Sequence, residues 1–282
     1  MNRGKKIYLC AINNVLSGSC SEDCRFCSQS ARYRADIDRY GFKSLDTVLH
    51  EASIAISNGA VGYCLVTAGR SLDDRKCEYL SRTAKELKKR FPSLWLIGCN
   101  GTADEESLRH LAESGIDSYN HNLESSEGYY PQICTTHSWS ERYSTCEAVK
   151  RAGLMLCCGG IFGMGESRKD REELIEAIAS LRPEAVPVNF FIPNPSLPIG
   201  ERNIDSDEAL RVIESVSRKV SPSILMVAGG RESLLSGREE EMYRAGCNSI
   251  VIGDYLTTRG EKAERDRAAI ANLGYEIADS CS

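Results

Sequence analysis

Residues 45–67, LDTVLHEASIAISNGAVGYCLVT, contain the repeating unit of this chain. Residues 45–57 carry apolar side chains at i, i+3 and i+4, which is typical of an amphipathic helix. Gly59 follows directly, and a glycine at this position adopts the left-handed conformation at little cost, so it ends the helix. Residues 60–67 are a short apolar run, which predicts a buried strand.

The same unit recurs along the chain, with glycines at Gly115, Gly153 and Gly246 after further helical segments. The predicted strands span residues 6–12, 60–67, 94–100, 116–123, 154–162, 185–192, 223–229 and 249–255. The predicted helices span residues 45–57, 76–91, 106–115, 140–153, 170–181 and 206–220. About eight strand–helix units favour a (β/α)8 barrel over an open doubly wound sheet. We expect a single domain over residues 1–282, ending in a helix and a short tail.

Composition excludes several functional classes. The net charge of −5, with acidic and basic residues mixed along the chain, does not indicate nucleic-acid binding. Apolar runs are too short to span a bilayer, and the N-terminal apolar segment is too short for an export signal. The chain has 13 cysteines, an odd number. We therefore expect free or metal-bound thiols in a reducing cytoplasm rather than a disulfide framework.

Cys20, Cys24 and Cys27 form the pattern C-x-x-x-C-x-x-C in the loop after the first predicted strand. This loop lies at the C-terminal end of the barrel, where active sites of the fold are found. Three readings are open. The cysteines are ordinary buried thiols, or they hold zinc, which favours four ligands at structural sites. Alternatively, they hold an iron–sulfur cube with one iron free to bind a small molecule.

This pattern, with Phe26 before the last cysteine, resembles the radical S-adenosylmethionine superfamily. The resemblance implies that the three thiolates hold a 4Fe–4S cluster, whose open iron binds the amino and carboxylate groups of S-adenosylmethionine. In that superfamily, one electron from the cluster cleaves the sulfonium and produces a 5′-deoxyadenosyl radical.

Further stretches narrow the resemblance to the biotin synthase family: GSCSEDCRFCSQSARY, SYNHNLE, QICTTHSWSERY, CCGGIFGMGES and VPVNFF. It implies that Asn120, Asn122 and Asn189 contact dethiobiotin. It also implies that Glu124 accepts hydrogen bonds from the ribose hydroxyls of the adenosyl group. Arg142 is expected to pair with the methionyl carboxylate. The positions that we expect beside the cofactor are Phe26, Gly159 and Gly160.

The resemblance also implies an auxiliary iron–sulfur cluster deep in the barrel, which supplies the inserted sulfur. Its expected ligands are Cys64, Cys99 and Cys157. The family's fourth ligand is an arginine on the seventh strand, but this chain has Met226 and other apolar residues there, and Arg231 belongs to the following Gly-Arg-Glu. We therefore expect either a 2Fe–2S cluster or a variant with a different fourth ligand.

Two spare thiols, Cys134 and Cys158, could take that position, although Cys158 directly follows Cys157 and should point to the other face of the strand. The remaining cysteines are expected to be small buried or incidental side chains: Cys10, Cys77, Cys146, Cys247 and Cys281.

The resemblance implies an enzyme that inserts sulfur between C6 and C9 of dethiobiotin to form biotin. Two other functions remain open at this point. One is a different radical S-adenosylmethionine enzyme on the same barrel, and the other is an iron–sulfur protein that only carries electrons. The resemblance further implies a flavodoxin- or ferredoxin-type electron donor and a homodimer.

Overall fold

The computed structural model of the protein describes residues 6–254 and 260–281. Parallel strands form a barrel in the order β1-β2-β3-β4-β5-β7-β8-β9, and pairing between β1 and β9 closes it. These strands are β1 (Lys6–Leu16), β2 (Gly62–Thr67), β3 (Trp95–Cys99), β4 (Ser118–Asn120), β5 (Met155–Cys157), β7 (Ala185–Phe190), β8 (Ile224–Val227) and β9 (Ser249–Val251). The predicted (β/α)8 barrel is thus confirmed. Tyr255, the last residue of the eighth predicted strand, lies outside the described residues.

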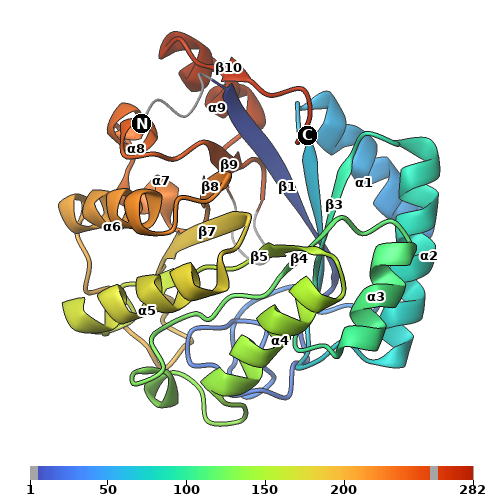
Figure 1. Ribbon diagram of the computed structural model, residues 1–282, viewed down its shortest axis with the longest axis horizontal. Coiled ribbons are helices and arrows are strands. Elements are labelled where there is room, and N and C mark those ends of the chain that lie inside the picture. Colours follow the sequence, from blue (N-terminus) through green and yellow to red (C-terminus); the bar gives the residue numbers. More distant parts are fainter. Residues whose placement is uncertain (1–5, 255–259, 282) are drawn as a thin grey trace.

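Helices cover the outside of the strands: α1 to α3 lie on one side in Figure 1, α5 and α6 on the other, and α4 between them. The long helices are α1 (Leu45–Ser57), α2 (Asp74–Arg90), α3 (Glu105–Glu113), α4 (Trp139–Arg151), α5 (Arg168–Leu181) and α6 (Ser206–Lys219). Each begins at a Ser or Asp whose side chain accepts a backbone N–H of the first turn. The glycines predicted to end helices have positive φ, for example +94° at Gly59 and +101° at Gly115.

The structure departs from the predicted elements in small ways. The fifth predicted strand is split into β5 and β6 (Gly160–Phe162), and β6 pairs with β7. The split follows from Gly159, whose N–H donates to the side chain of Asn122 (3.1 Å) instead of to a neighbouring strand. The C-terminal helix is present as α9 (Ala263–Asn272) and is followed by a strand that was not predicted, β10 (Glu276–Ile277), beside β1.

Three further short elements were also missed: η1 (Tyr130–Gln132), α7 (Arg231–Leu234) and α8 (Glu239–Arg244). Among the described residues, no helix combines the length and apolarity needed to cross a membrane.

The hydrophobic core lies mainly between the strands and the helices. On β1, the buried side chains of Leu9, Ala11 and Val15 belong to this layer. Because side chains alternate along a strand, the residues between them face the interior of the barrel. Interior-facing positions therefore carry polar side chains and thiols without weakening the main core.

Candidate active site

A cavity of about 380 Å³ opens at the C-terminal ends of the strands. The loop after β1 forms one wall, and residues at or just after the ends of β2, β3, β4, β6 and β7, together with His137 and Arg142, form the others. Ten of the predicted site residues line it: Cys20, Cys24, Phe26, Cys27, Cys99, Asn120, Asn122, Glu124, Arg142 and Asn189. Residues far apart in the sequence thus meet at the end of the barrel where the fold places chemistry.

The three cysteines of the first loop face this cavity together. A backbone hydrogen bond from Cys27 N to Cys24 O (3.0 Å) forms a tight turn between two of them, and Cys20 pairs with Gln29 (3.1 Å). Burial, with a smaller contribution from a charge at Cys20, raises the pKa of Cys27 to about 11. Clustered thiols of this kind ionise when a metal replaces their protons. Three sulfur donors on one wall therefore fit an iron–sulfur cluster.

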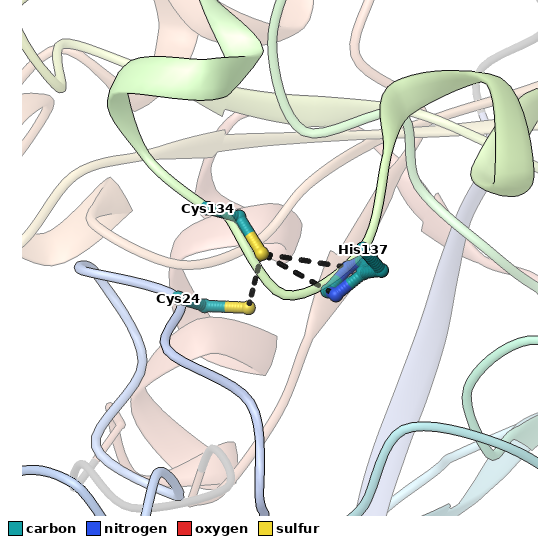
Figure 2. Close-up of side chains that lie close together, drawn as sticks. All are labelled: Cys24, Cys134 and His137. Atoms are coloured by element: carbon teal, nitrogen blue, oxygen red, sulfur yellow. Dashed lines mark hydrogen bonds between the residues drawn. The ribbon is translucent and has the colours of Figure 1, made fainter.

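A second loop brings Cys134 and His137 against Cys24 (Figure 2). The two Sγ atoms are 3.7 Å apart, and Nδ1 of His137 is 3.3 Å from the Cys134 sulfur. The hydrogen bond from Cys24 lowers the pKa of Cys134 to about 4, with a further contribution from His137. Cys134 therefore lies beside the first cysteine loop and not at the auxiliary position for which it was one candidate.

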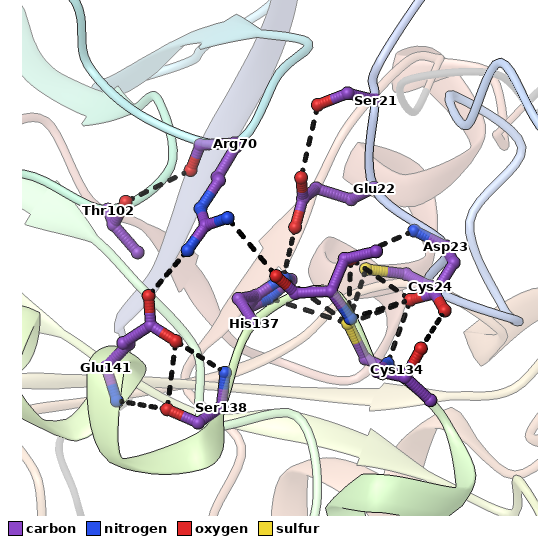
Figure 3. Close-up of polar contacts among 12 residues, drawn as sticks. Ser21, Glu22, Asp23, Cys24, Arg70, Thr102, Cys134, His137, Ser138 and Glu141 are labelled. Carbon is purple, nitrogen blue, oxygen red and sulfur yellow. Dashed lines mark hydrogen bonds and ion pairs between the residues drawn. The ribbon is translucent and has the colours of Figure 1, made fainter.

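Carboxylates of the cysteine loop hold this second loop in place (Figure 3). Asp23 accepts hydrogen bonds from the backbone N–H groups of Thr135 (2.9 Å) and Thr136 (3.2 Å) and from both threonine hydroxyls. Glu22 bonds Nδ1 of His137 at 2.6 Å. Burial opposes ionisation of Asp23, but the hydrogen bonds outweigh it and lower the pKa of its carboxyl group. Thr135, Thr136 and His137 therefore fix the backbone around Cys24.

Arg142 and Glu124 form a largely buried ion pair beside His137. Nη2 of Arg142 is 3.3 Å from Oε1 of Glu124, and each side chain is 12% exposed. The arginine also donates from Nε to the carbonyl of Asn122 (2.6 Å), and its Nη1 lies 3.2 Å from Nε2 of His137. Burial raises the pKa of Glu124, while the charge of Arg142 lowers it.

Glu124 has one oxygen left for a ligand. Within the described part of the chain, its buried Oε2 has no hydrogen-bond partner. Its backbone is in the left-handed region, with φ of +68°, which strains a residue other than glycine. A strained, buried carboxylate with an unused acceptor fits a ligand that donates hydroxyl groups.

Deeper in the barrel, Cys64, Cys99 and Cys157 gather around Asn120. The thiol of Cys99 donates to Oδ1 of Asn120 (3.7 Å), and Nδ2 of Asn120 donates to the Cys157 sulfur (3.3 Å). A hydrogen bond between Cys64 and Cys99 raises the pKa of the former and lowers that of the latter. The three thiols predicted for the auxiliary cluster thus lie together, which fits a second cluster at this depth.

Two other residues considered for that cluster have different surroundings. Cys158 faces the helices, as the alternation along the strand predicts, and its sulfur is 3.7 Å from that of Cys146 on α4, so it does not lie at the position for which it was a candidate. Arg231 is buried and bonds both carboxylate oxygens of Asp266 (2.8 and 3.1 Å). It therefore points to α9 and not to the three deep thiols.

Gly159 and Gly160 are not among the residues that line the cavity. A side chain at Gly159 would meet the carbonyl oxygen of Pro187 at 1.9 Å, and one at Gly160 would meet the carbonyl of Glu124 at 2.9 Å. The structure thus explains both glycines by close packing of backbones. Their contact with a cofactor stays a prediction.

Sequence reasoning missed several polar residues of the cavity, among them Glu22, Gln29 and His137. The side chain of Gln29 accepts from Gly18 N (2.5 Å), while its buried Nε2 has no partner in the described part of the chain. The stretch QICTTHSWSERY contains His137, but only Cys134 and Arg142 within it are assigned roles from the sequence.

Comparisons with known proteins agree with this site. The radical SAM superfamily profile matches residues 14–178, and the profile of the Biotin and Thiamin Synthesis associated domain matches residues 187–276. Biotin synthase of Sulfurovum sp. (strain NBC37-1) is 58% identical over 282 residues, covering 100% of this chain and 99% of that protein. Biotin synthase of Nautilia profundicola is 50% identical over 277 residues and covers 98% of this chain and 100% of its own length.

Solved structures of lower identity share the fold. Methylornithine synthase (PylB) has a TM-score of 0.82 at 18% identity, covering 98% of this chain and 84% of that one. The FeFe-hydrogenase maturase HydG from Carboxydothermus hydrogenoformans has a TM-score of 0.85 at 16% identity, covering 99% and 69%. The chain is more than half identical, over its full length, to a biotin synthase, and both family profiles match it. It therefore belongs to the biotin synthase family of the radical S-adenosylmethionine superfamily.

Proposed function

We propose that the cavity binds S-adenosylmethionine and dethiobiotin between two iron–sulfur clusters, and that the chain inserts sulfur between C6 and C9 of dethiobiotin to form biotin. As a member of the biotin synthase family, the chain is a radical S-adenosylmethionine enzyme with a 4Fe–4S cluster and an auxiliary iron–sulfur cluster. The observation that carries the residue assignment is the cavity itself. It joins the three loop cysteines, the three asparagines and the Glu124–Arg142 pair on one surface.

We assign each cluster to the three thiolates that lie at one depth in the barrel. Cys20, Cys24 and Cys27 hold the 4Fe–4S cluster near the mouth, and Cys64, Cys99 and Cys157 hold the auxiliary cluster below it. When bound, the 4Fe–4S cluster would supply the electron that cleaves S-adenosylmethionine to a radical able to remove hydrogen from dethiobiotin, and the auxiliary cluster would supply the sulfur.

The Glu124–Arg142 pair offers partners to the polar groups of the cofactor. Glu124 accepts hydrogen bonds from the ribose hydroxyls at its free Oε2, because a carboxylate is a good acceptor for two neighbouring hydroxyl groups. Arg142 is held by Asn122 and Glu124 and pairs with the methionyl carboxylate. Phe26, Gly159 and Gly160 complete the surroundings of the cofactor.

Dethiobiotin is oriented by Asn120, Asn122 and Asn189, whose amides offer both donors and acceptors to a ureido group. Asn189 lies at the end of β7, where it accepts from Gly229 N (3.0 Å) and donates to Gly160 O (3.3 Å). These bonds fix the orientation of its amide before a ligand arrives.

The remaining proposals, on domain number, location, oligomeric state and electron donor, follow from the family resemblance. We propose that the chain acts as one domain in the cytoplasm, as a homodimer, and takes electrons from a flavodoxin- or ferredoxin-type donor.

The test is product analysis under anaerobic conditions. The reconstituted protein receives a reductant, S-adenosylmethionine and dethiobiotin, and mass spectrometry measures 5′-deoxyadenosine and biotin. Both products are expected, and biotin should disappear when dethiobiotin is left out. Formation of 5′-deoxyadenosine without biotin would indicate a different radical reaction. Absence of both products from protein with intact clusters would indicate an electron carrier.

A further inference from the structure

We propose that Cys10 is the fourth protein ligand of the auxiliary iron–sulfur cluster, together with Cys64, Cys99 and Cys157. This inference rests on the proposed placement of that cluster. It assigns a role to a residue on β1 that the sequence led us to regard as incidental.

Cys10 faces the interior of the barrel. Its neighbours Leu9 and Ala11 pack in the layer between strands and helices, so Cys10 points to the opposite side of β1. It is 5% exposed. A Cβ atom built on Gly62 would lie 3.1 Å from the Cys10 sulfur. The missing side chain of Gly62 therefore leaves the space that this sulfur occupies.

Strand pairing places Cys10 next to Cys64. Cys10 pairs with Gly62 on β2, and Cys64 is two residues further along β2 on the same face. Side chains two residues apart on a strand stand roughly 7 Å apart. Cys10 and Cys64 are thus interior neighbours on adjacent strands.

The tilt of the strands also places Cys10 at the height of Cys157. In an eight-strand barrel of this class, residues at one height advance by about one position per strand around the barrel, and alternate strands contribute the side chains of one layer. Applied to the observed pairings, this rule puts Cys10, Cys157 and Met226 in one layer. Ile97 of β3 is the fourth member of the layer.

The other candidates for this position are engaged elsewhere. Arg231 is bound to Asp266, Cys134 lies beside Cys24, and Cys158 lies beside Cys146. Met226 shares the layer of Cys10, but its neutral thioether is a weaker ligand for iron than a thiolate. A fourth thiolate also adds negative charge, which lowers the reduction potential of the cluster relative to a neutral ligand.

The test isolates the auxiliary cluster. In a background with Cys20, Cys24 and Cys27 all changed to Ala, reconstituted protein retains iron at the auxiliary site alone. Iron and sulfide content and the Mössbauer spectrum are then compared for this background and for added Cys10→Ala, Cys10→Ser and Cys64→Ala. Cys247→Ala is the matched control, because Cys247 is buried in the layer outside the barrel. Circular dichroism shows whether each variant is folded.

We expect both Cys10 variants to lose at least half of the iron or to change the Mössbauer spectrum, while Cys247→Ala matches the background. Unchanged iron content and spectrum in both folded Cys10 variants would overturn the inference. If Cys64→Ala loses iron in that case, the auxiliary site stands and only the role of Cys10 fails. If neither Cys10→Ala nor Cys64→Ala changes the iron content, the proposed auxiliary site itself fails, and the inference fails with it.

Discussion

Replacement of Glu124 by Gln removes the charge of the buried ion pair and keeps the shape of the side chain. Oε1 of Glu124 is 3.3 Å from Nη2 of Arg142, and its Oε2 is the acceptor that we assign to the ribose of S-adenosylmethionine. In the Gln variant, an amide –NH₂ replaces one oxygen. If it takes the place of Oε2, it meets the ribose hydroxyls as a donor, and if it takes the place of Oε1, it meets the guanidinium.

The expected loss follows from the strength of hydrogen bonds to charged groups. Such bonds contribute about 1.5–3 kcal/mol each. Since 1.4 kcal/mol corresponds to a tenfold change, the Kd for S-adenosylmethionine should rise about 10- to 150-fold. The retained bond from Nε of Arg142 to Asn122 should keep the arginine in place.

Glu124→Gln should also change the pH dependence of binding. Burial raises the pKa of Glu124, so the folded protein holds this proton more tightly than the unfolded chain. This group therefore stabilises the fold at pH values below its unfolded pKa, and the contribution is lost as the pH rises through its folded pKa. Cofactor binding has the opposite sign, because it needs the ionised form. The affinity of the parent protein should fall as the pH drops towards the raised pKa, whereas that of the Gln variant should stay nearly constant.

Isothermal titration of the reconstituted protein with S-adenosylmethionine, over a series of pH values, measures both effects. The matched control is Glu127→Gln, three residues away on the exposed surface, which should bind like the parent. Iron content and absorption spectra show that the clusters are intact in each protein. A Kd for Glu124→Gln within twofold of the parent, with an unchanged pH dependence, would refute the assigned role of this carboxylate.

Three further substitutions test other parts of the site. Cys24→Ser should lose the spectrum of the 4Fe–4S cluster and all 5′-deoxyadenosine, and substantial 5′-deoxyadenosine from this variant would contradict the assignment. Asn122→Ala should weaken dethiobiotin binding by about 1–3 kcal/mol, roughly ten- to hundredfold, in equilibrium dialysis; unaltered binding would remove the residue from the site. Arg231→Gln should lower the free energy of unfolding by about 3–5 kcal/mol, measured in urea, because Asp266 is left buried and unpaired. The folded Arg231→Gln protein should keep its auxiliary cluster, and loss of that iron alone would show that the arginine is a ligand.

Most of the barrel could be predicted because its signals are local. Helical periodicity, a glycine at the helix end and a short apolar run recur within about 25–30 residues, and these features alone determine each strand–helix unit. The elements that were missed depend on contacts outside such a unit. β10 is two residues long and exists through its pairing with β1, which lies at the other end of the chain.

The cavity residues at strand ends were predictable for a related reason. The C-terminal ends of parallel strands converge, so polar residues that end successive predicted strands meet at one rim. No such rule predicts where loop residues lie. Cys134 lies beside Cys24 because Asp23 binds the backbone of Thr135 and Thr136, across more than 110 residues of sequence. No local pattern around Cys134 specifies that contact.

For residues inside the barrel, the sequence does not show at which level along the barrel axis a side chain lies. The alternation of side chains correctly assigns Cys157 to the interior and Cys158 to the helix layer, since this needs only the period of a strand. Whether Cys10 reaches the same cluster as Cys157 depends on the register of every strand pair between β1 and β5. One residue of slip in any of these pairs would move Cys10 out of that layer. The sequence contains the thiol, but only the closed set of pairings places it level with Cys157, beside Cys64 and in the space that Gly62 leaves open. Cys10 on β1 and Met226, which stands on β8 where the family's arginine is expected, lie in one layer of the barrel. A thiolate at Cys10 would therefore complete the set of ligands that we propose without that arginine.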